Sequence, residues 1–215
     1  MDIIIKHGLK HARIEIKPDG SVRVIAPPHV NVDELVQRRR AWIERKRERL
    51  YSLIKDSIGL EDKLLLNGRF LELRLGQPLS FNNGYVVARD YRELKEWMRQ
   101  KLKRELEQRI RVLSLSLGVR PNSFAVRVQR RKWASCSSKG NLSFNLKIMA
   151  LPGTLREYIV IHELAHLKIP NHSKRFWKLV EEYYPEREKA DEELERYWLL
   201  IERNEVWNQI SAIKT

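Results

Sequence analysis

The sequence contains one group of residues with the spacing of a hydrolytic metal site. His162-Glu163-Leu164-Ala165-His166 follows the H-E-x-x-H pattern. Residues four apart share one face of a helix, so both imidazoles can reach one ion at about 2.0–2.1 Å. The glutamate beside the first histidine can accept a proton from water, which a zinc ion makes more acidic. The pattern therefore predicts zinc-dependent hydrolysis with Glu163 as the general base.

A catalytic zinc ion usually takes a third protein ligand, and His172 lies six residues beyond His166. A continuous helix would separate His162 from His172 by about 15 Å, so the chain must reverse between them. Ile169-Pro170-Asn171 supplies turn residues, although the metzincin pattern has glycine where this chain has Ile169. We expect His172 to be the third ligand. The alternative third ligand is a carboxylate of the last helical region. If His172 is the ligand, one of these carboxylates is expected to accept a hydrogen bond from a ligand histidine and so orient its ring. The candidates are Glu181, Glu182, Glu188, Asp191 and Glu192.

The segment that carries the pattern is apolar on nearly every side, which predicts a helix buried inside its domain. Tyr158-Ile159-Val160-Ile161 precedes the first histidine, and Leu167 follows the second. A carboxylate in such surroundings is costly unless a cation lies beside it. A bound metal ion would supply that cation.

Residues 1–89 are expected to form a small mixed α/β module built on hairpins. Two strands, over residues 12–17 and 22–26, flank a Pro18-Asp19-Gly20 turn, and a basic amphipathic helix follows from Asn31 to about Ile54. Asn-Gly pairs at 67–68 and 83–84 predict further hairpins.

Residues 90–215 are expected to form the metal-binding domain. Asp90 with Glu93 predicts the capped start of a long helix that ends near Gly118. Two short strands, at 124–128 and 142–144, predict a short antiparallel sheet, and the chain after Pro152-Gly153 is expected to be helical. The sequence therefore predicts an α+β fold with a domain boundary at residue 89/90.

The charge of the chain indicates anionic partners. Its formal net charge is +14, and no acidic residue lies between Glu107 and Glu157. The basic residues of this block are Arg109, Arg111, Arg120, Arg127, Arg130, Arg131, Lys132, Lys139, Lys147 and Arg156. Such a block forms either a solvated surface or an anion-binding face. Arg131, Lys132 and Lys174 are the candidates for contacting substrate by stabilising an oxyanion.

Cysteine content and hydropathy indicate the compartment. The single cysteine, Cys136, excludes an internal disulfide and is expected to pack as a structural thiol, so a metal must rely on histidine and carboxylate. No stretch approaches the roughly 18 apolar residues of a membrane span, and the first residues lack the apolar core of a secretion signal. These features predict a cytoplasmic protein without a membrane partner.

Taken together, these motifs resemble the YgjP-like metallopeptidase family, which is related to the SprT-like zincins. The segments that carry the resemblance are residues 131–137, 141–145, 158–167 and 171–173, with Phe176-Trp177 and Pro185. It covers nearly the whole chain and implies a zincin-type fold, one zinc ion on His162, His166 and His172, and Glu163 as catalytic acid and base. Where the family usually has glycine, this chain has Ala134. By analogy with zincins, the strand at 142–144 is expected to be the edge that an extended peptide joins.

Three functions are compatible with these features. The leading hypothesis is a zinc metallopeptidase acting on polypeptides, and the likeness to SprT-like proteins suggests substrates attached to DNA. The second is a metal-dependent nucleoside triphosphate pyrophosphatase, an activity ascribed to some family members, for which the basic block would attract the triphosphate. The third is a non-enzymatic nucleic-acid-binding module with a structural zinc. Glu163 argues against the third hypothesis, because a purely structural site needs no buried base.

Overall fold

The computed structural model describes residues 1–17 and 19–214, without the side chains of residues 53, 56 and 57. Pro18, the first residue of the expected turn, therefore lies outside the described residues. The contacts within the chain divide it into two compact units, Met1–Gly59 and Leu60–Thr215. None of the described helices combines the length and the apolar composition that a membrane crossing needs.

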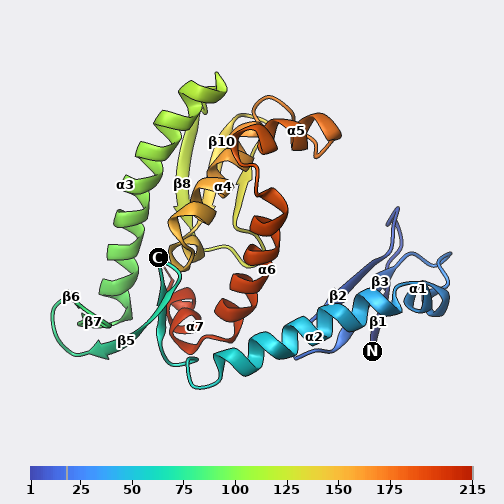
Figure 1. The fold of residues 1–215 in the computed structure, drawn as a ribbon, viewed down its shortest axis with the longest axis horizontal. Coiled ribbons are helices and arrows are strands. Elements are labelled where there is room, and N and C mark those ends of the chain that lie inside the picture. The colour runs from blue at the N-terminus through green and yellow to red at the C-terminus, as the bar shows by residue number, and fades with distance from the viewer. Residues whose placement is uncertain (18, 215) are drawn as a thin grey trace. The chain divides into compact units, whose positions relative to one another are not determined.

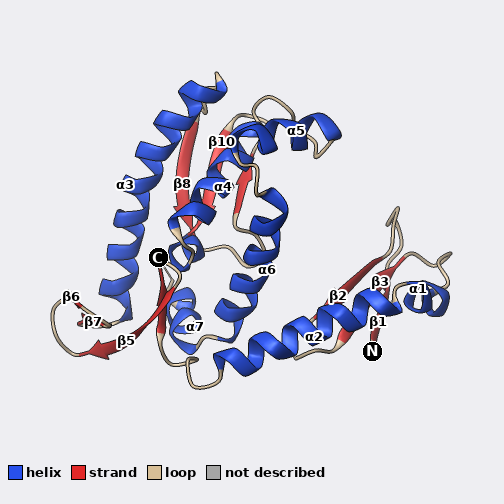
Figure 2. Cartoon of the chain, viewed as in Figure 1, coloured by secondary structure: helices blue, strands red, loops and turns tan. Residues whose placement is uncertain are grey.

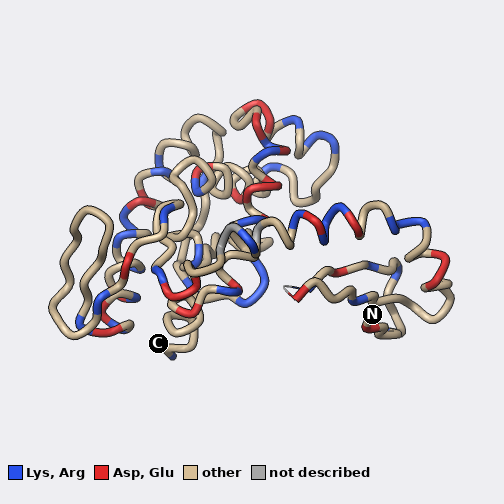
Figure 3. The backbone as a smooth tube through the Cα atoms, turned by 60° about the horizontal axis from the view of Figure 1, so that its bottom comes forward, with Lys and Arg blue, Asp and Glu red and all other residues tan. Residues whose placement is uncertain are grey.

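The first unit is a three-stranded sheet with two helices (Figure 1). Its elements are β1 (Asp2–Ile5), β2 (Arg13–Ile16), β3 (Val22–Ala26), α1 (Val32–Arg38) and α2 (Arg40–Ser57). β3 is central, antiparallel to β2 and parallel to β1, so the predicted hairpin is confirmed and an unpredicted edge strand joins it. Asn31 caps α1 by accepting from the backbone N–H of Glu34 at 3.1 Å. The single helix expected here is divided at Arg39, and basic and acidic positions alternate along α2 (Figure 3).

The second unit begins with two hairpins. Their strands are β4 (Leu64–Leu66), β5 (Arg69–Leu75), β6 (Ser80–Asn82) and β7 (Tyr85–Ala88), in the order β4-β5-β7-β6. Asn67 and Gly68 have φ angles of 51° and 79°, which a two-residue turn between antiparallel strands requires. Both hairpins predicted from Asn-Gly pairs are confirmed, because β4 pairs with β5 and β6 with β7 in antiparallel fashion.

This first sheet of the second unit packs into the same core as the helices after it. Leu64–Leu66, Val86 and Ala88 are buried in the unit's hydrophobic cluster, and Trp207 donates its indole N–H to the carbonyl of Leu65 at 2.8 Å. The boundary expected at residue 89/90 therefore lies inside the second unit, and the contacts place the division at residue 59/60. The shift from hairpins to helices is a change of secondary structure within one core.

A long helix leads from this sheet to a second one. The elements are α3 (Tyr91–Leu117), β8 (Ser123–Arg127), β9 (Ala134–Cys136) and β10 (Asn141–Asn145). Asp90 caps α3 by accepting from the N–H of Glu93 at 2.8 Å, and Gly118 ends the helix with a φ of 62°, as predicted. Figure 2 shows the first sheet at the N-terminal end of α3 and the second beside its C-terminal half.

The second sheet corrects two expectations. β10 is the central strand, parallel to β8 and antiparallel to β9, so the sheet is mixed rather than antiparallel. The connection expected between two strands contains the third strand, β9, which reverses the chain twice and makes β8 and β10 run the same way. The edge strands are consequently β8 and β9, and the strand at 142–144 is not available to an added peptide. Asn145 holds the connection by donating to the carbonyls of Gln129 at 2.9 Å and Lys132 at 2.8 Å.

Helices complete the second unit, as predicted for the chain after Pro152-Gly153, and a 3₁₀ helix that the sequence did not predict precedes them. The elements are the 3₁₀ helix η1 (Leu146–Ala150), α4 (Gly153–Ala165), α5 (Lys174–Tyr183), α6 (Arg187–Arg203) and α7 (Glu205–Ala212). α4 lies between α3 and α6 (Figure 1) and is buried through Val160, Ile161 and Leu164. The predicted α+β fold with a buried central helix is confirmed.

Ion pairs join α3 to α4, and a hydrogen bond joins α4 to the turn between β4 and β5. Arg156, whose side chain is 7 % exposed, donates to Glu105 at 2.8 Å and to the Asn67 side chain at 2.8 Å. Glu105 also accepts from Arg109 at 3.0 Å, and Arg109 pairs with Glu157. Two cations of the basic block therefore have structural partners.

We expect Glu105→Gln to lower the free energy of unfolding by about 2 kcal/mol, because it leaves the buried guanidinium of Arg156 without its carboxylate. Urea denaturation of the purified variants measures this change. Glu96→Gln is the matched control on the same helix, since Glu96 is about half exposed and should cost less than about 0.5 kcal/mol. Equal losses in the two variants would contradict the role of Glu105.

Candidate metal centre and its cleft

Helix α4 places two of the predicted residues, His162 and Glu163, in its last turn, and His166 caps its C-terminus. The helix is buried on both sides of these residues, so the backbone that carries them is held firmly by the core. The rings of His162 and His166 lie 5.0 Å apart between centroids. The four-residue spacing thus brings the two imidazoles to one face, as the sequence predicts.

The chain reverses after α4 and returns His172 to the same place. Nε2 of His172 lies 3.0 Å from Nε2 of His162, and its ring centroid lies 4.7 Å from that of His166. Apart from glycines, the described residues with positive φ comprise only Asn67, so Ile169 turns the chain without the left-handed backbone that favours glycine. The Ile169 carbonyl also lies 3.3 Å from Nδ1 of His166. A hydrogen bond there leaves Nε2 of His166 with its lone pair free.

Aromatic rings of α5 support the three histidines. The buried ring of Phe176 lies 4.5–4.9 Å from all three imidazole centroids, and it stacks on His166. The exposed ring of His172 stacks on Trp177, with centroids 5.3 Å apart and planes 21° apart. The guanidinium of Arg187 lies over Trp177 at 4.7 Å. His172 is therefore oriented by a stack that extends from α5 to α6.

We expect Trp177→Leu to weaken zinc binding about tenfold, because it removes the surface that orients the His172 ring. Competition with a fluorescent zinc chelator measures the affinity. Trp97→Leu is the matched control, since Trp97 packs against Phe81, in a tilted arrangement, instead of a histidine. If both variants bound zinc as tightly as the original chain, the stack would have no part in holding His172.

Glu163 lies in the same cleft and is deeply buried, with 6 % of the residue exposed. Among the described residues, no group forms a hydrogen bond with its Oε2, which is also buried. Burial raises the pKa of Glu163 to about 7, and the nearby charge of Lys132 opposes that rise. A buried, unpartnered carboxylate oxygen is costly unless a ligand, water or ion satisfies it.

The cleft beside Glu163 has a volume of about 890 Å³. Its lining combines β9 with the turn after it, the histidine cluster, the end of α3 and the segment after α4. The lining residues are Gly118, Val119, Arg120, Ala134, Ser135, Cys136, Ser137, Ser138, Gly140, His162, Glu163, His166, Leu167, Lys168, Pro170 and His172. The edge strand β9, the three histidines and Glu163 therefore line one cleft.

The donor set of this cluster fits a metal ion. One nitrogen from each of His162, His166 and His172 lies within 4.8 Å of the other two. Nitrogen ligands of a tetrahedral zinc ion lie about 3.3 Å apart, so small shifts suffice. Burial, with the neighbouring imidazoles second, lowers the pKa of His162 to about 3, so its lone pair is available at neutral pH. The orphaned Glu163 oxygen adjoins this cluster, as a general base must.

The three cations that the sequence predicts as substrate contacts differ in their position relative to Glu163. Lys132 lies close enough to act on the charge of Glu163, whereas the cleft lining does not include Arg131 or Lys174. Of the alternative carboxylates, Asp191 accepts from Tyr158 at 2.6 Å, and Glu181 pairs with Arg187. The described metal-ligand cluster includes none of these carboxylates.

Sequence reasoning missed several residues of the cleft. Arg120 and Lys168 line it, and so do the serines of β9 and of the turn after it. The signal for Arg120 is its place in the acid-free block, and that for Lys168 is its position two residues after His166. Cys136 is half-buried in the wall, and burial followed by the charge of Glu163 raises the pKa of its thiol.

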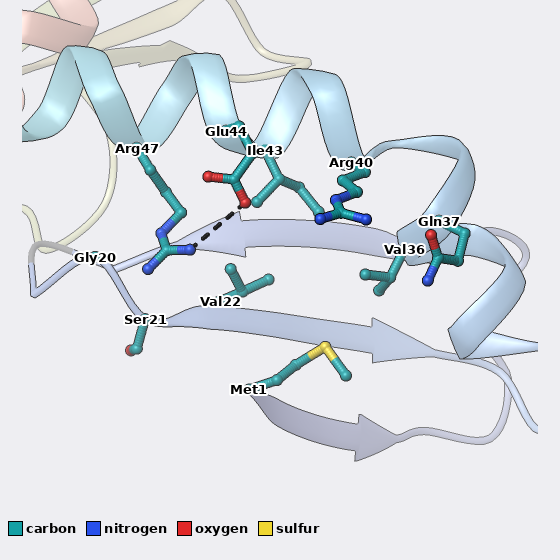
Figure 4. A pocket seen from close by; sticks show the side chains of 10 residues that line it. All are labelled: Met1, Gly20, Ser21, Val22, Val36, Gln37, Arg40, Ile43, Glu44 and Arg47. Atoms are coloured by element: carbon teal, nitrogen blue, oxygen red, sulfur yellow. Dashed lines mark ion pairs between the residues drawn. The ribbon is translucent and has the colours of Figure 1, made fainter.

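A smaller hollow of about 330 Å³ lies within the first unit (Figure 4). Helix α2 faces the strands there, and Arg47 pairs with Glu44. Its lining residues are Met1, Gly20, Ser21, Val22, Val36, Gln37, Arg40, Ile43, Glu44 and Arg47. The lining described there holds no histidine or cysteine, so this hollow lacks the donor set of the larger cleft.

Known metallopeptidases share sequence features with the chain. The profile of the family described as YgjP-like, metallopeptidase domain, matches residues 10–197. The metallopeptidase zymogen abylysin of Pyrococcus abyssi is 31 % identical, with 46 % of this chain and 97 % of that chain covered and a TM-score of 0.40. The zymogen jannalysin of Methanocaldococcus jannaschii is 24 % identical, with 41 % and 92 % covered and a TM-score of 0.38. No curated protein matches the chain. Because both TM-scores lie below 0.5, only the family match bears on the identity of the chain.

Proposed function

Because the chain belongs to the YgjP-like family of metallopeptidase domains, we propose that it is a zinc-dependent peptidase with one ion on His162, His166 and His172. The observation that carries this proposal is the convergence of three imidazole nitrogens beside a buried carboxylate oxygen that lacks a partner among the described residues. A zinc ion bound there would acidify water and polarise the scissile carbonyl.

The chain's own residues would then move the proton. Glu163 accepts a proton from the attacking water through its unpartnered oxygen, and later delivers it to the leaving amine. The core around α4 buries most of Glu163 and holds its carboxylate in the cleft that the histidines line. Lys132 acts on the charge of Glu163 from a neighbouring hollow, and the bound metal ion itself would steady the oxyanion.

The edge strand β9 is the proposed binding site for the substrate backbone. β9 pairs with β10 on one side only, so its other edge is free to accept an extended peptide. Ser135 and Cys136 of this strand line the cleft that also contains Glu163. A peptide added here would have its main chain beside the histidine cluster.

Hydrolysis of nucleoside triphosphates is the second candidate, favoured by the cations Arg120 and Lys168 in the cleft. Action on DNA-attached proteins has less support. Arg109 and Arg156 are used in ion pairs within the fold, and buried Lys147 pairs with Glu202. The basic block is therefore not one continuous anion-binding face.

The experiment that tests the proposal offers the purified, zinc-loaded protein an unfolded polypeptide, a protein crosslinked to DNA, and the four nucleoside triphosphates. We expect cleavage of the unfolded polypeptide, loss of this activity with a zinc chelator and recovery on adding zinc, since the metal supplies the acidity. Triphosphate hydrolysis with intact polypeptide would replace the proposal by its alternative. If the DNA-crosslinked protein were cleaved faster than the free polypeptide at low salt but not at high salt, the hypothesis of DNA-attached substrates would be supported.

A further inference from the structure

Cations lie on both sides of the edge strand β9. Arg120 and Lys168 line the cleft of the histidine cluster. A neighbouring hollow of about 460 Å³ on the face of the second sheet is lined by Arg127 and Lys132. Residues 135–137 belong to the walls of both hollows, so β9 separates two cationic surfaces.

These four cations differ from the other basic residues near the core. Arg109, Lys147 and Arg156 each pair with a carboxylate from a distant part of the sequence. Within the described part of the chain, no carboxylate forms an ion pair with the four cations beside β9. The described walls of the two hollows contain one carboxylate, Glu163, which the proposed mechanism uses. The cations beside β9 are therefore available to a ligand.

The position of Lys168 suits a ligand in the cleft. Its Nζ lies 3.9 Å from the point that a Cβ atom on Gly118 would occupy, at the C-terminal end of α3. The partial negative charge of a helix C-terminus favours an ammonium group there. Arg120 lies two residues further along the same wall. Both charges thus line the cleft beside the end of α3.

The geometry points to a peptidase that selects polypeptide segments with acidic side chains on both faces of the extended strand, and this inference rests on the proposed function. An extended peptide on the free edge of β9 points successive side chains to opposite faces. Carboxylates on one face meet Arg120 and Lys168, and those on the other meet Lys132, while Arg127 of β8 lies further across the sheet and adds to the positive field of that face. Basic side chains at the same positions are repelled.

The test measures binding and cleavage separately. Three fluorescein-labelled decapeptides share one apolar frame and carry four Glu, four Gln or four Lys residues. Their dissociation constants are measured by fluorescence anisotropy on zinc-loaded Glu163→Gln protein, which holds peptides without cutting them. We expect the Glu peptide to bind roughly tenfold more tightly than the Gln peptide, and the Lys peptide most weakly, with the differences shrinking in high salt. Equal affinity for the three peptides overturns the inference.

Charge reversal locates the effect. In the same background, Arg120→Glu with Lys168→Glu should remove the preference for the Glu peptide and favour the Lys peptide several-fold. Arg111→Glu with Lys103→Glu is the matched control, because both residues are exposed on α3 and do not line the cleft. A reversal by the control as large as that of the cleft variant would assign the preference to net charge and overturn the inference.

Failure of the two proposals can be told apart. If the Glu163→Gln protein prefers the Glu peptide but the original protein cuts none of the three, the peptidase proposal fails and the cationic binding site remains. If the original protein cuts all three at equal rates and binds them equally, the peptidase proposal holds and the selectivity is overturned. Tighter binding of inorganic tripolyphosphate than of the Glu peptide would overturn the assignment to acidic polypeptides.

Discussion

Glu163→Gln is expected to lower the rate of peptide cleavage by about a thousandfold while leaving the zinc content unchanged. The amide keeps the size of the side chain but cannot accept the proton from water, and general acid–base catalysis contributes about 10²–10⁴-fold. Retention of zinc is expected because the three histidine nitrogens, not Glu163, form the metal-ligand cluster. Steady-state kinetics on one fluorogenic peptide, with zinc measured by atomic absorption, gives both quantities.

The control for this variant lies six residues earlier on the same helix. Glu157→Gln removes a carboxylate that pairs with Arg109 and does not line the cleft. Its rate should stay within about twofold of the original. A Glu163→Gln enzyme that keeps more than a tenth of the activity would show that another group accepts the proton.

His172→Ala is expected to weaken zinc binding at least about a hundredfold, because three protein ligands become two. The fold should survive, since His172 is exposed in the turn between α4 and α5 and contributes little to the core. Isothermal titration of zinc into the metal-free variants measures the loss, and circular dichroism shows whether the helices persist.

His29→Ala is the control, since His29 is an exposed histidine of the first unit. It should bind zinc as tightly as the original chain. An unchanged affinity in His172→Ala would mean that the third ligand comes from elsewhere, for example from a carboxylate of α6.

The sequence predicts the centre of the site because the features that form it depend on residues close together in the chain. The four-residue spacing of His162 and His166 sets their shared helix face, and the apolar residues around them predict burial of α4. The return of His172 follows from chain geometry. A continuous helix would hold His172 too far from His162 for both to bind one ion, and Pro170 disfavours helix at the residue before it. The Asn-Gly hairpins and the capped start of α3 are also short-range features.

Features that depend on distant pairings could not be predicted. The place of β10 in the centre of its sheet depends on a parallel pairing with β8, which no turn signal specifies. Arg156 looks like a free cation in the acid-free block, but its partner Glu105 lies 51 residues away. The stack of His172, Trp177 and Arg187 joins α5 to α6 and also has no local pattern.

The same limitation explains the error about the substrate edge. Three short strands can be ordered in several ways, and burial of Leu142 and Phe144 identifies β10 as a core strand without showing its neighbours. Only the pairing of β9 with β10 leaves β9 as the edge beside the histidines. The cations that flank β9 become a candidate binding surface through this arrangement.

X-ray absorption at the zinc edge tests the central claim most directly, on full-length protein loaded with one equivalent of zinc. We expect one bound ion with three imidazole nitrogens at about 2.0–2.1 Å, and the loss of one imidazole in His172→Ala. A sulfur ligand at about 2.3 Å, which only Cys136 could supply in zinc's usual ligand set, or an ion without histidine ligands, would contradict the three-histidine site.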